Sequence, residues 1–244
     1  MNNTFKFYSV IFFSLILFSC RTTDFTSNGN YSYYVDCIDL DSPEIKICGK
    51  IDEKNHFNLM DFVDSENLSF AINTTPWEEK NSSSSLLGVH KVNNKILSGP
   101  VEKYSALGFY TNEEGKIRVK IIENQNSENL ESCFSAFGGY YTILQDSNII
   151  EYNEYHHSRS ACGTDSSGRY LYFFICTSNL ISDESGMTYQ ECAQILLEHG
   201  CTDALQFDGG HSSAMFTPKT NYKHAKLNKK IPAAFGICFR ANAL

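Results

Sequence analysis

The chain has 244 residues, of which 42% are hydrophobic and 20% charged, so it can bury the core of a large domain and lacks the composition of a disordered protein. Its 28 acidic residues outnumber its 20 basic residues and give a net charge of −8. No long basic cluster offsets this charge, so we expect no nucleic acid partner, because phosphate backbones are bound by basic surfaces.

Residues 1–19 have the pattern of an export signal. A lysine precedes an apolar run that is too short to span a bilayer comfortably, and a serine then precedes Cys20. This ending is similar to the lipobox of bacterial lipoproteins, in which the cysteine is lipidated; an ordinary secretory signal and an uncleaved anchor are the alternatives. The sequence predicts a signal peptide over 1–19, a lipid on Cys20, a tether over 20–30 and one domain over 31–244. We expect an exported protein that its lipid anchors to the membrane of the bacterial cell envelope.

Eight further cysteines follow Cys20. In an exported chain this even number permits up to four disulfides, whose pairing the sequence does not determine. Cys176, in a predicted strand, and Cys192, on a predicted helix, have an alternative interpretation as small buried hydrophobic residues. No Cys-x-x-Cys or His-x-x-x-His spacing indicates a metal site.

The first half of the domain predicts antiparallel β-structure. Runs rich in β-forming residues over 31–40 and 44–51 are consistent with an opening hairpin. A strand then ends at Asn73 and Thr74, followed by Pro76 and Trp77. Two later pairs of apolar runs flank Asn93-Asn94 and the segment 112–115, which are hairpin signals.

The second half brings together glycines, charged residues and one clear helix. Gly138 and Gly139 precede an apolar strand and permit close approach of a substrate or of another chain segment; the alternative is a bulge. Arg159 begins a strand that ends before Asp165, where residues 165–168 predict a hairpin turn. Residues 188–199 form a helix pattern that opens with a Thr-x-x-Glu capping box and stops at a glycine. These elements predict an α+β fold of mixed, largely antiparallel sheets with a few packed helices.

The strand pattern at 204–207 ends in a polar, glycine-rich stretch. Its residues are Asp208, Gly209, Gly210, His211, Ser212 and Ser213. A rigid strand that ends in an acid, two glycines and hydroxyl groups is typical of a ligand site. The alternative is a hairpin, because Asp-Gly between apolar runs is also a strong turn signal.

Four segments in this order resemble the phosphodiester glycosidase family: 159–165, the strand after it, 185–188 opening the capped helix, and 204–215. The resemblance covers roughly residues 137–239 and is weak before them. It departs from the family pattern at Ser160, Gln206 and His211, where the family usually has Thr, Asn and a third Gly. The bulky ring of His211 has two alternative consequences: the protein prefers a different substrate, or it binds the substrate without cleaving it.

The resemblance implies hydrolysis of a sugar-1-phosphodiester, which releases the sugar from a phosphorylated glycan or cell-envelope polymer. It implies catalytic roles for Asp208, Asp165 and Arg159. It also implies that the substrate is bound by Asn73, Thr74, Gly138, Gly139, Gly209, Gly210, His211, Ser212 and Ser213. In this hypothesis Arg159, the Gly209 and Gly210 amides and the two serines hold the phosphate, and Asp208 is the base or nucleophile.

Three other functions are alternatives to hydrolysis of a sugar-1-phosphodiester. A serine hydrolase would use Ser212 or Ser213 beside His211, but no Gly-x-Ser-x-Gly elbow is present. A non-catalytic glycan-binding lipoprotein would use Trp77 and the many tyrosines. A metal-assisted phosphodiesterase would bind a divalent cation between Asp165 and Asp208. Apart from that last case we expect no cofactor.

Overall fold

The computed structural model of the chain describes residues 26–27, 30–42, 45–80, 83–152, 155–178, 185–218 and 230–239. The predicted signal peptide, Cys20 and most of the predicted tether lie outside the described residues. No helix within the described ranges is long and apolar enough to cross a membrane.

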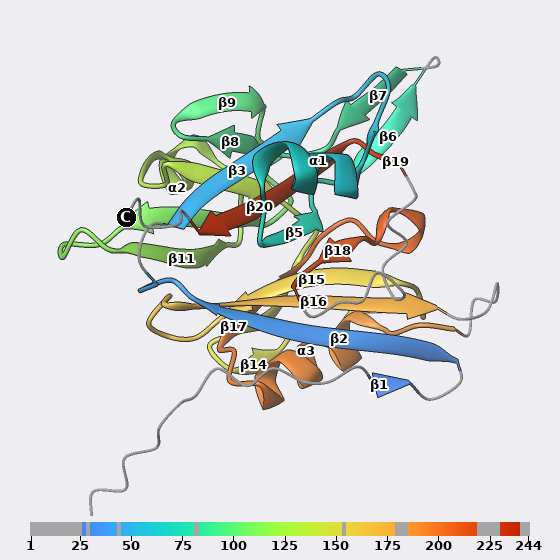
Figure 1. Cartoon of the computed structure of the whole chain (residues 1–244). Helices are drawn as coiled ribbons and strands as arrows, with labels where there is room; N and C mark the ends of the chain where they lie inside the picture. The colour runs from blue at the N-terminus through green and yellow to red at the C-terminus, as the bar shows by residue number, and fades with distance from the viewer. Residues whose placement is uncertain are drawn as a thin grey trace, which may run out of the picture.

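A seven-stranded sheet forms the lower layer of the molecule in Figure 1 and positions the candidate site. From edge to edge it contains β1 (Thr26–Ser27), β2 (Tyr31–Asp39), β16 (Tyr170–Ser178), β15 (Arg159–Thr164), β17 (Asp203–Gln206), β13 (Thr142–Gln145) and β14 (Asn148–Ile149). Its central strands are buried on both faces, which explains why β16 is apolar without strict alternation.

Two further large sheets lie above the first. One contains β18 (Met215–Phe216), β5 (Phe70–Asn73), β20 (Ala233–Phe239) and β3 (Ile45–Ile51). The other contains β11 (Ile117–Ile122), β10 (Ala106–Thr111), β12 (Ser135–Gly138), β8 (His90–Val92) and β9 (Lys95–Ser98). Two small ribbons pair β6 (Trp77–Lys80) with β7 (Ser83–Leu86), and β4 (Phe57–Asn58) with β19 (Lys230–Ile231).

The strand pairs of the described chain are all antiparallel. The predicted class is therefore confirmed in its dominant feature, while the expected mixture with parallel pairs is not observed. The opening hairpin is wrong: β2 pairs with β16, and β3 pairs with β20 in a different sheet. The later hairpins β8–β9, β10–β11 and β15–β16 are confirmed.

Phe235 of β20 connects the three sheets at the centre of the main core. Its ring stacks on Phe137 of β12 at 4.7 Å and on Phe173 of β16 at 5.5 Å between centroids. Phe109 of β10 and Phe207, after β17, contact the same ring edge-on. All five side chains are fully buried, so this cluster fixes the end of β17 against the upper sheets.

Helices cover the outer faces of the layers. Helix α3 (Tyr189–Glu198) packs beneath the seven-stranded sheet, and α1 (Leu59–Glu66), which the sequence analysis missed, packs on the four-stranded sheet. The capping box of α3 is present, with Thr188 and Glu191 bonded reciprocally. The short helix α2 (Ser127–Glu131) lies in the segment 124–131, for which the sequence left a helix and a loop as alternatives.

Six buried cysteines of the described chain have free thiols: Cys48, Cys133, Cys162, Cys192, Cys201 and Cys238. Cys176 and Cys192 are both fully buried in the hydrophobic cluster around α3, as expected for small hydrophobic residues. Burial raises the pKa of the Cys162, Cys192 and Cys201 thiols well above their ordinary value, so these thiols are unreactive.

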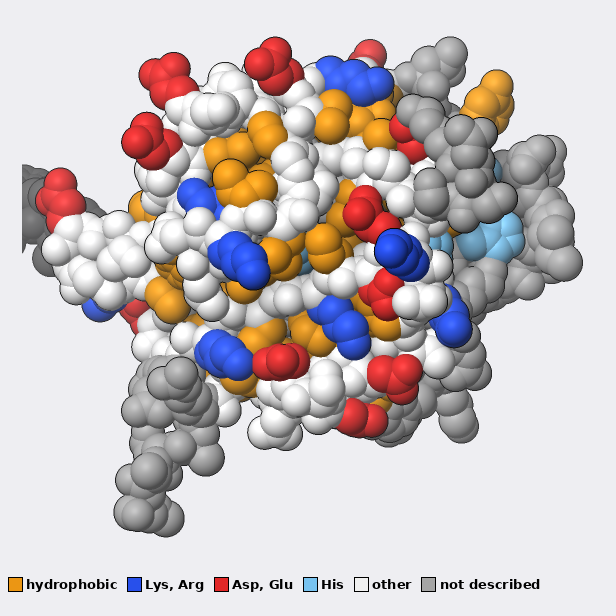
Figure 2. Space-filling view, turned by 90° about the horizontal axis from the view of Figure 1, so that it is seen from above, with side chains coloured by type: hydrophobic (Ala, Val, Ile, Leu, Met, Phe, Trp, Pro, Cys, Tyr) orange, Lys and Arg blue, Asp and Glu red, His pale blue; other side chains and the backbone are white. Residues whose placement is uncertain are grey.

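Figure 2 shows the face seen from above, where small hydrophobic patches lie between Lys, Arg, Asp and Glu side chains. Charges of both signs alternate across the described part of this face.

Candidate active site

Asp208 lies at the end of β17, in the middle of the seven-stranded sheet. Its backbone is held by a segment of the four-stranded sheet: its N–H donates to the Thr74 carbonyl at 2.8 Å, and its carbonyl accepts from Asn73 Nδ2 at 2.7 Å. The strand end is thus clamped from the neighbouring sheet. Asp208 has little freedom to move relative to either layer.

Asn73 is the centre of this clamp. Besides its bond to Asp208, its Oδ1 accepts from the Ser160 hydroxyl at 2.7 Å and from the Ala214 amide at 3.0 Å. The side chain is 1% exposed and these bonds use its oxygen and its nitrogen. Asn73 and the fully buried Thr74, both predicted to bind substrate, therefore act as positioning residues for Asp208.

The Asp208 carboxyl is only partly exposed and lies among hydrogen-bond donors. The Gly209 amide donates to its Oδ1 at 3.0 Å, and the Trp77 indole Nε1 donates to the Ser212 hydroxyl at 3.4 Å beside it. Burial raises the pKa of Asp208 to about 6, against the opposing effect of hydrogen bonds from Ser212, Gly209 and Trp77. A carboxyl with a pKa near neutrality can take up and release a proton under physiological conditions.

The loop after Asp208 turns into a short 3₁₀ helix, η1 (Gly210–Ser212), instead of a return strand paired with β17. Gly210 has a φ of +57°, which favours glycine. The Gly210 amide donates to the Ser158 carbonyl at 2.8 Å, and the Gly209 amide is bonded to Asp208. In this structure the two amides stabilise the loop itself, and their binding of phosphate stays a prediction.

The three remaining loop residues differ in accessibility. The His211 side chain is exposed and Ser212 is partly exposed. Ser213 is fully buried, and its hydroxyl has no hydrogen-bond partner among the described atoms. Of the two serines, Ser212 is the one placed to contact a ligand.

Arg159, at the start of β15, lies beside this loop. A Cβ atom on Gly209 would lie 3.9 Å from Arg159 Cδ and only 2.9 Å from the Ser158 carbonyl, so the close approach requires glycine. The guanidinium is held in place: Nε donates to the Met187 carbonyl at 2.8 Å, Nη2 donates to the Tyr155 carbonyl, and Cζ lies 4.3 Å from the Tyr189 ring centroid. Arg159 is thus buried and fixed, with the aliphatic part of its side chain near Gly209 and its guanidinium on the Met187 and Tyr155 carbonyls and the Tyr189 ring.

Asp165 does not join this group. In the antiparallel register Ala161 lies opposite Gln206 and Thr164 opposite Asp203, so Asp165 is at the other end of the sheet from Asp208. The full length of β15 separates it from Arg159, roughly 20 Å at the usual rise per residue. Its carboxylate accepts from the Tyr170 and Ser167 amides and caps the β15–β16 turn. The structure therefore does not bring Asp165, predicted as a second catalytic carboxylate, to Asp208.

Gly138 and Gly139 also have a structural role. A Cβ on Gly139 would lie 2.1 Å from Leu205 Cδ1 and 2.5 Å from the Gln206 carbonyl oxygen, and one on Gly138 would lie 3.1 Å from the Val89 backbone. The space beside both glycines is filled by protein. Gly138 allows a close approach to Val89, and Gly139 allows a close approach to β17. Substrate binding by these two glycines stays a prediction.

The site also contains residues that the sequence analysis did not select. Tyr189 lies under Arg159, and Gln206, noted there only as a departure from the family pattern, donates from Nε2 to the Ser160 carbonyl at 2.8 Å. Nothing in the sequence around Tyr189, which directly follows the N-cap residue Thr188, predicts its contact with Arg159.

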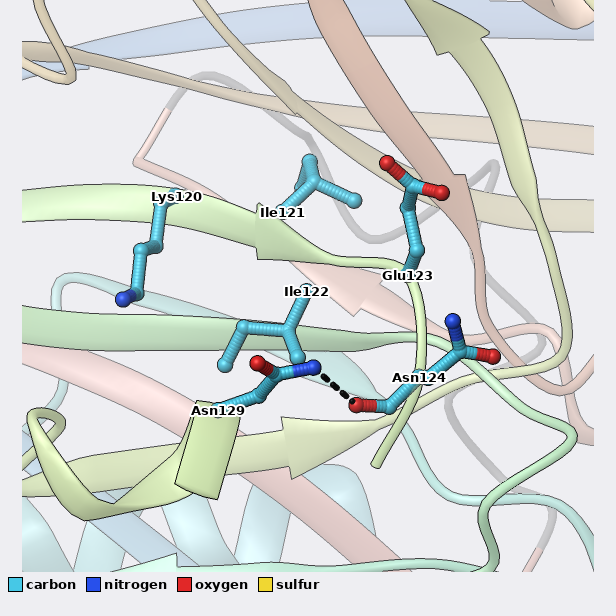
Figure 3. Close-up of a pocket in the computed structure, with 6 residues that line it drawn as sticks. All are labelled: Lys120, Ile121, Ile122, Glu123, Asn124 and Asn129. Atoms are coloured by element: carbon cyan, nitrogen blue, oxygen red, sulfur yellow. Dashed lines mark hydrogen bonds between the residues drawn. The ribbon is translucent and has the colours of Figure 1, made fainter. Parts of the chain in front are cut away.

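A separate polar pocket of about 290 Å³ lies at the end of β11 and is drawn in Figure 3. It is lined by Lys120, Ile121, Ile122, Glu123, Asn124 and Asn129, and the Asn129 side chain donates to the Asn124 carbonyl at 3.0 Å. None of the predicted site residues lines it. Across the described residues, no group of three or more His, Cys, Asp or Glu could hold a metal ion.

The candidate site therefore consists of an aspartate whose backbone is clamped at a strand end and a following loop that contacts the Arg159 side chain. The sequence model of the phosphodiester glycosidase family matches residues 66–238, which is more than two thirds of the chain. The chain therefore belongs to the phosphodiester glycosidase family. No curated protein sequence matches it significantly.

Solved structures share the fold. A protein from Synechocystis is similar with a TM-score of 0.68 and 13% identity over 90% of this chain, which spans 61% of that structure. The catalytic domain of zebrafish N-acetylglucosamine-1-phosphodiester α-N-acetylglucosaminidase, auto-inhibited by its pro-peptide, is similar with a TM-score of 0.61 and 14% identity. The match covers 90% of this chain and 88% of the zebrafish domain. At these identities the likeness concerns the fold alone.

Proposed function

We propose that the protein hydrolyses a sugar-1-phosphodiester and releases the sugar from a phosphorylated glycan or cell-envelope polymer. The observation that carries the proposal is Asp208, whose backbone is clamped by Asn73 and Thr74 and whose following loop contacts the Arg159 side chain, in a chain of this family. The zebrafish relative is named for this class of reaction.

The proposed hydrolysis needs few catalytic side chains. A water oxygen forms a bond to the anomeric carbon, the bond from that carbon to the phosphate oxygen breaks, and the electron pair leaves with the phosphate. Asp208, ionised above a pH of about 6, takes the proton of the attacking water. The phosphate departs as a weak base and needs little help from an acid. The remote position of Asp165 is compatible with this route, since no second carboxylate is required.

Arg159 and Ser212 are assigned to the phosphate. Arg159 contributes its fixed positive charge, which favours the negative charge that develops on the leaving phosphate. Ser212 contributes a hydroxyl that the Trp77 indole orients. Trp77 is itself partly exposed and is the aromatic surface assigned to the sugar ring.

The test is release of free sugar from a panel of sugar-1-phosphodiesters by the purified domain. Asp208→Asn is expected to lower kcat by at least about a hundredfold, in line with loss of a general base. Asp165→Asn, a matched substitution at the far end of the same sheet, is expected to leave kcat within about twofold. Saturable binding of the diesters without any release would instead support the glycan-binding function, and His211→Gly would then be tested for restored cleavage.

The same assay addresses the metal-assisted alternative. That function required Asp165 and Asp208 to share a cation, and the two residues lie at opposite ends of the sheet. We expect activity to survive a chelator. Loss of activity with the chelator and its return with a divalent cation would contradict the proposed mechanism.

We also propose that the protein is exported and lipid-anchored through Cys20. The support is the signal-like sequence of residues 1–19. Labelling of the full chain with a fatty-acid analogue in a bacterial host is expected for the wild type and absent for Cys20→Ala. Equal labelling of both proteins would refute the anchor.

A further inference from the structure

An open apolar groove lies between helix α2 and the β8–β9 hairpin, and we call it the α2 groove. It has a volume of about 510 Å³ and is lined by the hydrophobic residues Val89, Ile96, Pro100 and Leu130. None of the residues assigned to the candidate active site lines it. Its volume is within the range of ligand-binding pockets, so it has room for one or two side chains of a partner.

Exposed hydrophobic side chains mark the outer wall of the α2 groove. Ile96 is 59% exposed, and the neighbouring Leu97 is 36% exposed. In the described part of the chain one other large hydrophobic side chain, that of Tyr155, is as exposed as these. Two of the three therefore lie next to each other on β9. Hydrophobic side chains that gather at the rim of an apolar pocket are typical of an interaction site.

Strand β9 is the edge of the five-stranded sheet. Among the described strands it pairs only with β8, and it lies at the outer rim of the molecule in Figure 1. Along its other side, its backbone N–H and C=O groups can pair with an extended segment of another chain. Because Ile96 is more than half exposed, the groove is open along this edge and does not enclose a small molecule. The geometry therefore fits a polypeptide laid along β9.

The charges that a ligand meets in the α2 groove are negative. Lys91 also lines the groove, but it is only 8% exposed and its ammonium donates to the Leu130 carbonyl at 3.1 Å. Glu128 and Glu131 are exposed and, three residues apart on α2, lie on neighbouring parts of its surface. Neither carboxylate forms an ion pair with another described residue. A positively charged side chain of the partner complements them.

We propose that the α2 groove binds an extended segment of a partner polypeptide that runs along β9. An aliphatic side chain of this segment lies between Ile96 and Leu130. A Lys or Arg side chain lies at Glu128 and Glu131, two residues away from the aliphatic one, because every second side chain of a strand points to the same face. The interaction is separate from the proposed hydrolysis. Sequence alone did not indicate it, because the hairpin and α2 meet only in the folded chain.

The probes are capped, fluorescein-labelled threonine peptides of seven residues, and their binding to the purified protein is measured by fluorescence polarisation. The first peptide carries Ile and Arg two residues apart, the second has Glu in place of Arg, and the third has Ser in place of Ile. We expect the first peptide to bind about tenfold or more tightly than the serine peptide, in line with burial of one aliphatic side chain. We expect it to bind about fivefold or more tightly than the glutamate peptide, and added salt should reduce this difference.

The backbone of the first peptide tests the pairing with β9. N-methylation of every second amide on one edge of the peptide should abolish binding, whereas the same change on the other edge should not, because only one edge faces β9. Equal binding of both methylated peptides would contradict strand pairing and overturn the proposal.

Charge reversal at the groove provides the matched test on the protein. Glu128→Lys combined with Glu131→Lys should reverse the preference, so that the glutamate peptide binds more tightly than the arginine peptide. Glu113→Lys combined with Glu114→Lys is the control, because it makes the same change in net charge in the exposed β10–β11 turn, which does not line the groove. Ile96→Ser should weaken binding of the arginine peptide about tenfold. All five side chains are exposed, so the variants are expected to fold.

Several results would overturn the proposal. They are absence of saturable binding, equal binding of the three peptides, and a preference that charge reversal leaves unchanged. Self-association that Ile96→Ser abolishes, without peptide binding, would assign the groove to a second copy of the chain. Binding of hexylammonium without binding of any peptide would assign it to small amphipathic cations. None of these results bears on the proposed function, which is measured by sugar release.

Discussion

Replacing Asp208 by Asn is predicted to stabilise the folded protein at neutral and alkaline pH. Burial is the largest influence on the Asp208 carboxyl and raises its pKa from the ordinary 3.8 to about 6. The folded state therefore binds the proton more tightly than the unfolded state does. The stability linked to that proton is fully present below about pH 3.8 and is lost as pH rises through about 6.

The magnitude follows from the difference between the two pKa values. At about 1.4 kcal/mol for each tenfold change in the acid constant, the wild type loses up to about 3 kcal/mol of unfolding free energy between about pH 4 and pH 8. The asparagine introduced at this position cannot ionise, and its side-chain oxygen can still accept the Gly209 amide bond. The advantage of the variant should therefore grow from near zero at about pH 4 to between about 1 and 3 kcal/mol at about pH 8.

The assay is urea unfolding of both proteins at several pH values, followed by circular dichroism. If the unfolding free energy of both proteins falls with urea concentration at the same slope, the unfolding transition itself is unchanged. An advantage of the variant that does not depend on pH would refute burial of an ionising group as the cause. A variant less stable than the wild type at about pH 8 would contradict the electrostatic description of the site.

Three further predictions concern the clamp, the core and the titration of the site. Asn73→Ala leaves the Asp208 carbonyl, the Ser160 hydroxyl and the Ala214 amide without their bonds, so chemical denaturation should show a loss of about 2–4 kcal/mol and sugar release should fall in parallel. Phe235→Ala should cost about 3–5 kcal/mol by the same measurement, because a fully buried ring that contacts four others is removed; a loss below about 1 kcal/mol would contradict its central place. The pH profile of kcat/KM should rise through an apparent pKa of about 6 as Asp208 ionises, and a flat profile down to about pH 4.5 would exclude Asp208 as the base.

Local patterns in the sequence were sufficient for the elements that local chemistry determines. The capping box of α3, the asparagine turn of the β8–β9 hairpin and the strand ending at Asp208 all depend on residues within a few positions of one another. Asn73 and Arg159 were also selected, since each lies at the end of a strand. Their roles as hub of the clamp and fixed cation depend on partners more than twenty residues away.

Apart from the missed helix α1, the differences between prediction and structure come from non-local contacts. Strands β2 and β3 have hairpin spacing, but each pairs with a strand of the second half of the chain. Gly138 and Gly139 indicate close approach, and only the folded chain shows that the approaching groups are Val89 and β17. Asp165 follows Arg159 closely in sequence, yet an extended strand separates them by its full length. Because Thr164 pairs with Asp203, that end of the strand lies away from Asp208.

The central claim is that the bond between the sugar and the phosphate oxygen breaks with Asp208 as the base. The most direct test is hydrolysis of a sugar-1-phosphodiester in water enriched in heavy oxygen, with mass spectrometry of both products. The mechanism predicts that the label enters the free sugar at its anomeric carbon, that the phosphate product remains unlabelled, and that Asp208→Asn forms neither product. Label in the phosphate product would show cleavage of the phosphorus–oxygen bond and would contradict the glycosidase mechanism.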